Sequence, residues 1–179
     1  MAKMLRNTAD RLCRFRPRFL SVTYGTGRSS RDATLATLME IAQRTGLPLA
    51  GHLTCVGASR RSVDAVAVSY WESGIRHVVA LRGDPPTGAQ AYRPHPKGYR
   101  DAADLVSGLL RIADFEISVA GYPEVHPDSA SRSSDLDNLK RKLDAGASRV
   151  ITQFCFDSDR ILRFIESARA IGIEAPVAV

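Results

Sequence analysis

One stretch decides the fold: Arg76-His77-Val78-Val79-Ala80-Leu81-Arg82-Gly83-Asp84-Pro85-Pro86. Its first half is a short Val-rich apolar run, which is typical of a strand buried on both faces. Gly83 and the two prolines then end the strand, because proline has no backbone N–H for a ladder hydrogen bond. Arg82 and Asp84 therefore stand at the carboxyl end of a buried strand, where α/β enzymes place their chemistry. An Arg–Asp ion pair that only holds a loop is the alternative.

Similar units lie on both sides of this stretch. Strands are predicted over residues 18–24, 47–55, 115–122, 149–156 and 174–179, and helices over 1–15, 32–44, 59–71, 101–113, 133–145 and 158–170. Ser59 is expected to cap one helix at its start, and Gly46, Gly74 and Gly146 end others. The strands begin about thirty residues apart, the spacing of βα units with parallel strands. This repeat predicts an α/β fold, either a doubly wound sheet or a (β/α)8 barrel. No Gly-x-Gly-x-x-Gly motif follows the first strand, which disfavours a Rossmann domain.

Composition indicates an ordinary globular protein. The 179 residues are 44% hydrophobic and 25% charged, and they suit a single domain over residues 1–179. The net charge is +6, but the basic residues are scattered among acids, so we expect anionic small molecules rather than nucleic acid as partners. Three cysteines without a Cys-x-x-Cys motif indicate a reduced, cytoplasmic location. No signal peptide or membrane-length apolar run is found, and the scattered His and Cys predict no metal site.

Polar or aromatic side chains recur where the predicted strands end. They are Thr23, Tyr24, His52, Thr54, Arg82, Asp84, Tyr122, Glu124, His126, Gln153 and Asp157. Parallel strands bring their carboxyl ends to one edge, and buried polar groups cost free energy unless they are paired. A long Pro- and Gly-rich segment, residues 85–100, falls at the same edge. The pattern therefore predicts an enzyme or binding site there, of unspecified chemistry.

At these positions the chain closely resembles the methylenetetrahydrofolate reductase family. The matching motifs, in the family's order, are Ser21-Val22-Thr23-Tyr24-Gly25, His52-Leu53-Thr54-Cys55, Gly74-Ile75-Arg76-His77, Ala80-Leu81-Arg82-Gly83-Asp84, Tyr122-Pro123-Glu124-Val125-His126-Pro127, Asn138-Leu139-Lys140-Arg141-Lys142-Leu143-Asp144-Ala145-Gly146-Ala147 and Thr152-Gln153-Phe154. The resemblance implies a (β/α)8 TIM barrel that holds FAD at the carboxyl ends of its strands. It also implies reduction of 5,10-methylenetetrahydrofolate to 5-methyltetrahydrofolate with NAD(P)H, within one-carbon and methionine metabolism, by a cytoplasmic homo-oligomer.

The resemblance also implies roles for individual residues. Asp84 and Gln153 are the expected catalytic residues, and together with Thr23 they are expected to bind the substrate. The expected FAD contacts are Thr23, Tyr24, His52, Arg82, Gly83, Asp84, Ala102, Tyr122, His126, Asp135, Asn138 and Lys142. Lys142 is expected at the pyrophosphate, since an anion of that kind needs a cation. Without the resemblance, residues 140–142 are better interpreted as a solvated helix face, and His52 and His126 as structural histidines.

The resemblance begins at the family's first helix and ends within its sixth strand. We therefore expect an incomplete barrel of about six βα units, without the first strand and the last two units. The family's Phe-Glu-Phe-Phe-Pro-Pro motif, whose Glu is the proton donor, has no counterpart here, so impaired turnover is expected. A non-catalytic flavin- or anion-binding barrel remnant is the main alternative. A barrel enzyme that acts on phosphorylated substrates is a weaker one.

Overall fold

The computed structural model describes residues 2–23, 28–85, 88 and 91–179. The helices are α1 (Ala2–Cys13), α2 (Arg28–Thr45), α3 (Arg60–Glu72), α4 (Ala102–Ile112), α5 (Arg132–Asp144) and α6 (Ser158–Ala170). The strands are β1 (Leu20–Val22), β2 (Leu49–Thr54), β3 (His77–Leu81), β4 (Glu116–Gly121), β5 (Arg149–Thr152) and β6 (Val177–Ala178). Helices and strands alternate throughout, so the predicted βα repeat is confirmed.

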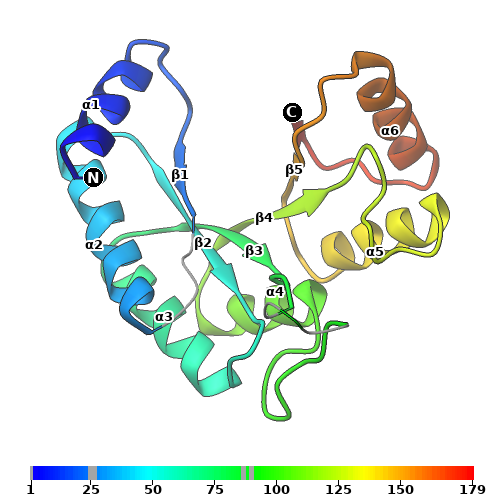
Figure 1. The fold of residues 1–179 in the computed structure, drawn as a ribbon, viewed down its shortest axis with the longest axis horizontal. Helices are drawn as coiled ribbons and strands as arrows, with labels where there is room; N and C mark the ends of the chain where they lie inside the picture. Colours follow the sequence, from blue (N-terminus) through cyan, green and yellow to red (C-terminus); the bar gives the residue numbers. More distant parts are fainter. Residues whose placement is uncertain (1, 24–27, 86–87, 89–90) are drawn as a thin grey trace.

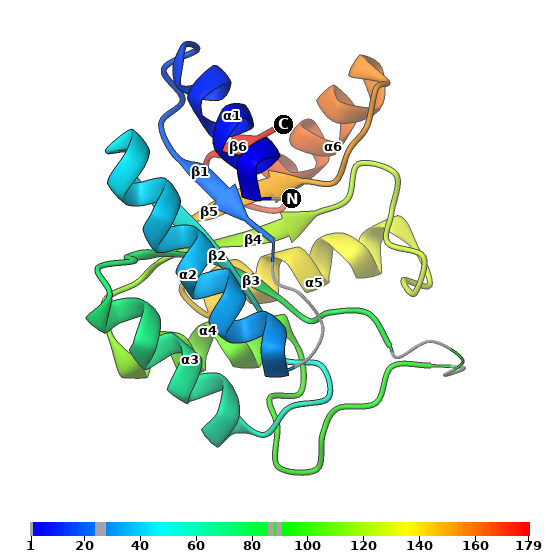
Figure 2. The ribbon, with the colours of Figure 1, turned by 60° about the vertical axis from the view of Figure 1, so that its left-hand side comes forward.

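The six strands form one parallel sheet in the order β1-β2-β3-β4-β5-β6. A doubly wound sheet reverses its strand order at a switch point, whereas a barrel adds each strand beside the one before it. The sequential order therefore decides for the barrel type. Figures 1 and 2 show α2 to α5 outside a curved row of strands, as in part of a (β/α)8 barrel. Within the described residues, β1 and β6 each pair on one side only, so the barrel is incomplete.

Several element ends differ from the predictions. The strands predicted over 149–156 and 174–179 are confined to Arg149–Thr152 and Val177–Ala178. The expected start of α5 at Ser133 or Ser134 is wrong, because Ser131 caps the helix and forms a reciprocal capping box with Ser134. The Ser59 cap is confirmed by its side chain, which accepts a hydrogen bond from the backbone N–H of Ser62.

Alternation along the strands divides the sheet into two faces. The outward residues pack beneath the helices to form the core, with Leu53, Val78, Ile117, Val119 and Val150 all buried. Helix α3 approaches so closely that a Cβ atom on Gly51 would lie 2.5 Å from the Tyr70 ring. The inward residues are more polar, and they form two groups, one at each end of the strands.

The group at the amino-terminal end is a buried network around His77. The Nε2 atom of His77 lies 2.7 Å from the Ser118 hydroxyl and 3.2 Å from the Arg149 guanidinium. Arg149 can only donate, so Nε2 acts as an acceptor and carries no proton in this arrangement. Arg149 also pairs with Glu116, and the Phe19 ring lies edge-on to the imidazole at 4.6 Å. The network thus joins β3, β4 and β5 through side chains.

This network predicts acid sensitivity. Burial lowers the pKa of His77 and the Arg149 cation adds to the decrease, while Glu116 opposes it. The unfolded chain therefore binds a proton more readily than the folded chain, so stability is lost as pH falls below about 6.5. We expect urea unfolding between pH 7.5 and 5 to show a smaller loss of stability in His77→Gln than in the unsubstituted chain. Equal losses in both proteins would contradict this assignment.

The described part of the chain contains no membrane-spanning helix, no cluster of side chains arranged to bind a metal ion, and no disulfide bond. No helix there is long and apolar enough to cross a membrane. That part of the chain also holds no group of three or more His, Cys, Asp or Glu side chains arranged to bind a metal ion. The three cysteines, Cys13, Cys55 and Cys155, are free thiols.

Candidate cofactor site

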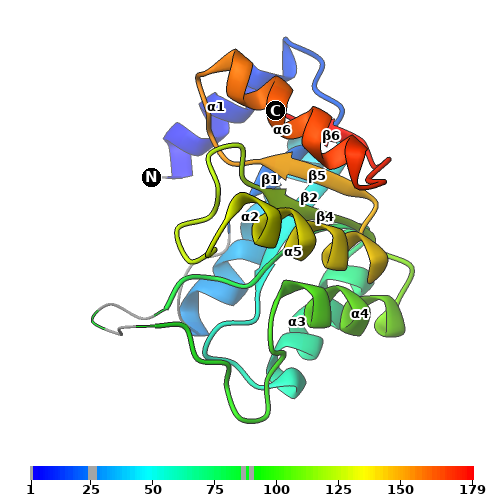
Figure 3. The same ribbon diagram turned by 90° about the vertical axis from the view of Figure 1, so that its right-hand side faces the viewer.

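The second inward group surrounds a pocket of about 710 Å³ at the carboxyl ends of β2 to β5. Figure 3 shows the segments after β3, β4 and β5 extending from this same side of the sheet. The pocket brings together most of the residues that the sequence predicted for the site. These are His52, Arg82, Gly83, Asp84, Ala102, Tyr122, His126, Asn138, Lys142 and Gln153. Of the polar strand ends, His52, Arg82, Asp84, Tyr122, His126 and Gln153 converge on this pocket, whereas Thr23, Thr54, Glu124 and Asp157 do not line it.

Aromatic and imidazole rings form one part of the wall. The rings of Tyr122 and His126 pack edge-on with their centroids 4.6 Å apart. Burial raises the pKa of the Tyr122 phenol, and burial lowers the pKa of His52 on β2. Tyr122 is thus held as a neutral donor, and His52 is biased toward its uncharged form. Such a surface suits the flat face of an aromatic ligand.

Arg82 is another lining residue, and two side chains hold it in place. Its guanidinium donates to the Asp128 carboxylate at 2.7 Å and lies over the Tyr92 ring, 4.5 Å from the centroid. Tyr92 comes from the long segment after β3, and its hydroxyl lies 3.8 Å from the Cys55 thiol. The Arg82–Asp84 ion pair that the sequence left open does not occur, because Arg82 pairs with Asp128 instead.

Lys142 is the buried cation of the pocket. It lies on α5 with 5% of its surface exposed, and its amine donates to the Ala120 carbonyl at 2.5 Å. Burial lowers the pKa of this amine to about 8, although Asp135 counteracts part of the decrease. The solvated-face interpretation of residues 140–142 is therefore wrong for Lys142. It describes Lys140 better, since that amine pairs with Asp144 on an exposed part of α5.

Asp135 and Asn138 lie near Lys142 on α5 but differ in position. Asp135 is buried and does not line the pocket; its carboxylate accepts from the His126 backbone N–H at 3.3 Å and the Ser129 hydroxyl at 2.9 Å. It thereby fixes the segment that carries His126. Asn138 does line the pocket, and its amide oxygen accepts from Arg141 at 2.7 Å.

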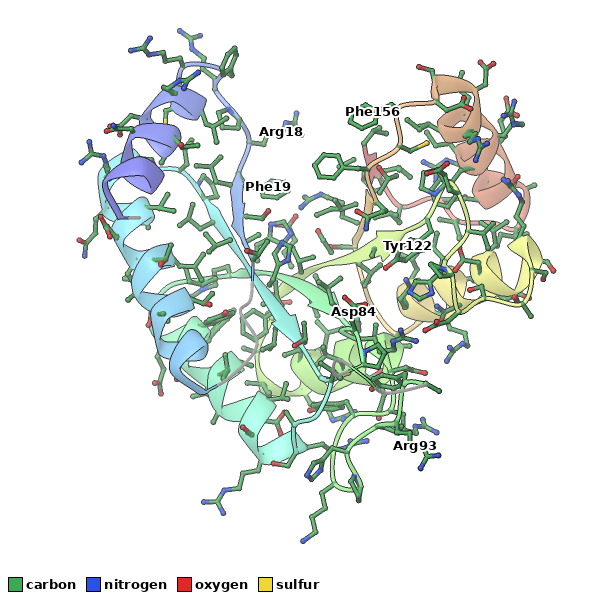
Figure 4. The ribbon with its side chains drawn as sticks, viewed as in Figure 1. Arg18, Phe19, Asp84, Arg93, Tyr122 and Phe156 are labelled. Atoms are coloured by element: carbon green, nitrogen blue, oxygen red, sulfur yellow. The ribbon has the colours of Figure 1, made fainter. Side chains whose placement is uncertain are left out.

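Asp84 and Gln153 are exposed lining residues of the pocket, on the segments after β3 and β5, which have β4 between them. Figure 4 shows Asp84 and Tyr122 on the segments after β3 and β4, with Arg93 farther out on the long segment. Gln153 is exposed just beyond β5, and its Oε1 atom accepts from the backbone N–H of Phe154 at 3.0 Å. Its amide NH₂ group is a hydrogen-bond donor.

Thr23, like Asp135, is a predicted contact that does not line the pocket, and it is exposed just beyond β1. Tyr24 lies outside the described residues. The structure also adds lining residues that the sequence analysis did not select for the site, among them Tyr92, Asp101, Asp128, Ser129, Ala130, Ser134 and Arg141. Of these, Asp101 could have been found from the sequence. It caps the helix that follows the long segment after β3, and that position lies at the edge of the sheet where the strands end.

A family model described as methylenetetrahydrofolate reductase matches residues 1–179. The chain belongs to the methylenetetrahydrofolate reductase family. It is 50% identical over 177 residues to the 5,10-methylenetetrahydrofolate reductase of Salmonella typhimurium, which covers 99% of this chain and 58% of the relative. It is also 37% identical over 179 residues to methylenetetrahydrofolate reductase (NADH) 1 of Arabidopsis thaliana, covering 94% of this chain and 30% of that protein.

Solved structures with little sequence identity share the fold. A putative lyase/mutase from Burkholderia cenocepacia superposes with a TM-score of 0.67 at 19% identity, over 96% of this chain and 64% of that one. A 2,3-dimethylmalate lyase gives a TM-score of 0.65 at 11% identity, over 95% and 60% of the two chains. At such identities the likeness concerns the fold alone. The chain spans somewhat more than half the length of its bacterial reductase relatives.

Proposed function

We propose that this chain forms the flavin-binding part of a 5,10-methylenetetrahydrofolate reductase that uses NAD(P)H. The observation that carries the proposal is the pocket, in which ten residues expected from the family resemblance meet at the carboxyl ends of four neighbouring strands. About 50% identity to relatives with this activity over nearly the whole chain supports it.

The chemistry of the pocket fits FAD. Lys142 is a buried ammonium that hydrogen-bonds to a carbonyl and, among the described residues, to no carboxylate. A bound pyrophosphate would therefore supply the anionic partner that this cation needs. The segment just before α5 contributes Ser129 and Ala130 to the lining and the first turn of α5 contributes Ser134, and a helix N-terminus favours negative charge. The rings of Tyr122 and His126 offer an apolar wall for a flat heterocycle.

When bound, FAD would supply the redox chemistry, because a flavin can accept a hydride and pass it on. The chain's own residues would bind and orient the reactants. The Asp84 carboxylate, with its two acceptor oxygens, suits the paired N–H groups on the edge of a pterin. Gln153 carries both a donor and an acceptor, so its neutral amide can contact a folate and a nicotinamide in turn. Arg82, fixed by Asp128 and Tyr92, keeps the segment that bears Asp84 in position.

The first test is flavin binding by the 179-residue chain. After incubation with FAD and removal of free flavin, absorption bands at about 380 and 450 nm should remain with the protein. Adding NADH or NADPH without oxygen should then bleach the band at about 450 nm, which reports reduction of the bound flavin. Flavin that elutes wholly apart from folded protein would contradict the proposal. Bound flavin that neither nicotinamide reduces would favour the non-catalytic alternative.

A pair of variants tests the substrate roles. In a chain that binds flavin, Asp84→Asn and Gln153→Leu should leave the flavin bands in place. Both should weaken the spectral response of the bound flavin to added folate, because each removes a hydrogen-bonding or charged group that lines the pocket. Asp159→Asn on α6 serves as the control, since its side chain does not line the pocket. An unchanged folate response in both pocket variants would remove these assignments.

A further inference from the structure

The Lys142 amine combines burial with access to a pocket. The chain contains four lysines, at positions 3, 97, 140 and 142. Lys97 is exposed and Lys140 is partly exposed, whereas Lys142 is buried and lines the pocket. Within the described part of the chain its amine donates one hydrogen bond, to the Ala120 carbonyl, and a neutral amine that donates this bond keeps its nitrogen lone pair. Among the lysine side chains that the structure describes, it alone has this combination.

An amine in this position is a nucleophile near neutral pH. Burial lowers its pKa to about 8, so about a tenth of the amine is uncharged at pH 7 and about half at pH 8, where an exposed lysine is almost entirely protonated. Desolvated lysines of this kind form imines with carbonyl compounds. The Arg141 guanidinium lies one residue away in sequence and also lines the pocket, and its positive charge further disfavours protonation of Lys142.

The pocket also selects the type of carbonyl compound. The Arg82 and Arg141 side chains line it in ion pairs with Asp128 and Asp101, and the start of α5 at Ser134 lines it as well. A guanidinium has five N–H groups, so a paired arginine keeps donors for a second anion, and a helix N-terminus also favours a ligand with a negative group. The volume of about 710 Å³ accommodates a small aromatic ring that carries a phosphate.

We propose that Lys142 is a covalent capture site for small aldehydes that carry a phosphate group. The lone pair of the amine attacks the aldehyde carbon, and a C–N bond forms. The carbonyl oxygen takes up protons and leaves as water, while the nitrogen loses its two protons, so the product is an imine. No electrons are exchanged with any other reactant, and water reverses the reaction. The inference concerns the amine itself and holds whether or not flavin is the natural ligand.

Pyridoxal 5′-phosphate is the probe for the test. The 179-residue chain is incubated with it, the imine is reduced with borohydride, and the modified lysines are identified by peptide mass spectrometry. Lys142 should be labelled about tenfold faster than Lys97 or Lys140 at neutral pH. Its labelling rate should level off above about pH 8, while that of the exposed lysines continues to rise. Even labelling of the lysines, or none at Lys142, would overturn the proposal.

Three variants and a competitor separate this proposal from the flavin site. Lys142→Arg keeps a cation but should abolish the fast labelling, and Lys142→Met should do the same. Lys140→Met, on the same helix, should leave it unchanged. If FAD occupies the pocket, it should slow labelling of Lys142 in proportion to its own binding. Labelling at Lys142 that FAD does not affect would support the capture site and count against the proposed flavin site. Flavin binding without any labelling at Lys142 would support the flavin site and overturn the capture site.

Discussion

Replacing Lys142 by methionine is expected to stabilise the chain without ligand by about 2 kcal/mol at pH 7. The folded chain holds the Lys142 pKa at about 8, against an ordinary value of 10.5, so keeping the buried amine charged costs about 3 kcal/mol. Methionine fills a similar volume without a charge, but it leaves the Ala120 carbonyl without its donor, which offsets about 1 kcal/mol of the gain. Urea unfolding at pH 7 measures the difference.

The stability difference between Lys142→Met and the unsubstituted chain should depend on pH. Between about pH 8 and 10.5 the unfolded chain binds a proton at Lys142 that the folded chain does not, so the stability contribution of this group rises with pH. The advantage of Lys142→Met should therefore shrink as pH approaches 10. Lys140→Met, whose amine is exposed and paired with Asp144, should change stability by about 0.5 kcal/mol or less. A less stable Lys142→Met at pH 7 would contradict the assignment of Lys142 as a costly buried cation.

The same substitution should weaken flavin binding. Removing the one buried cation that the described pocket offers to a pyrophosphate should raise the Kd for FAD by about a hundredfold. Stability and ligand binding would then move in opposite directions. This combination distinguishes a residue retained for a ligand from one retained for folding. Loss of both stability and binding would instead indicate a structural lysine.

Gly83→Ala is expected to destabilise the chain by about 3 kcal/mol. Gly83 follows β3 with φ at +85°, a conformation that a residue with a Cβ atom adopts at a cost. A Cβ atom there would also lie 2.5 Å from Cγ1 of Val56, so either the backbone or Val56 must move. Any such shift displaces the neighbouring Arg82 and Asp84, so flavin affinity should fall by at least about tenfold. Thermal unfolding and flavin titration measure the two effects.

Gly57→Ala is the matched control. Gly57 has a similar φ of +63°, but a Cβ atom there would meet nothing within 4 Å. Its substitution should cost about 1 kcal/mol, because only the backbone conformation is unfavourable. The difference between the two variants isolates the close approach of Val56 to Gly83. Equal effects would mean that Val56 rotates away without strain.

The sequence by itself determined the βα repeat and most of the element positions. Alternating apolar strands and amphipathic helices are local patterns, and caps such as Ser59 act through neighbouring backbone groups. Six of the strand-end residues, including His52, Arg82 and Tyr122, line the pocket, whereas Thr23, Thr54, Glu124 and Asp157 do not. The selection of the six follows from the geometry of parallel strands, whose carboxyl ends always meet at one edge. The family motifs added Ala102, Asn138 and Lys142, which lie on helices.

The residue patterns left both the barrel and the doubly wound sheet open, and the family resemblance implied the barrel; the tertiary structure confirmed it through the strand order, which depends on how distant segments pair. It also decided the partners of the charges. Asp128 rather than Asp84 pairs with Arg82, and Tyr92 from the long segment covers the guanidinium. Lys140 and Lys142 are two residues apart on one helix, yet only packing against β4 buries the second and lowers its pKa. Burial and ion pairing depend on residues that are distant in sequence and come together only in the fold, so a local sequence pattern does not predict them.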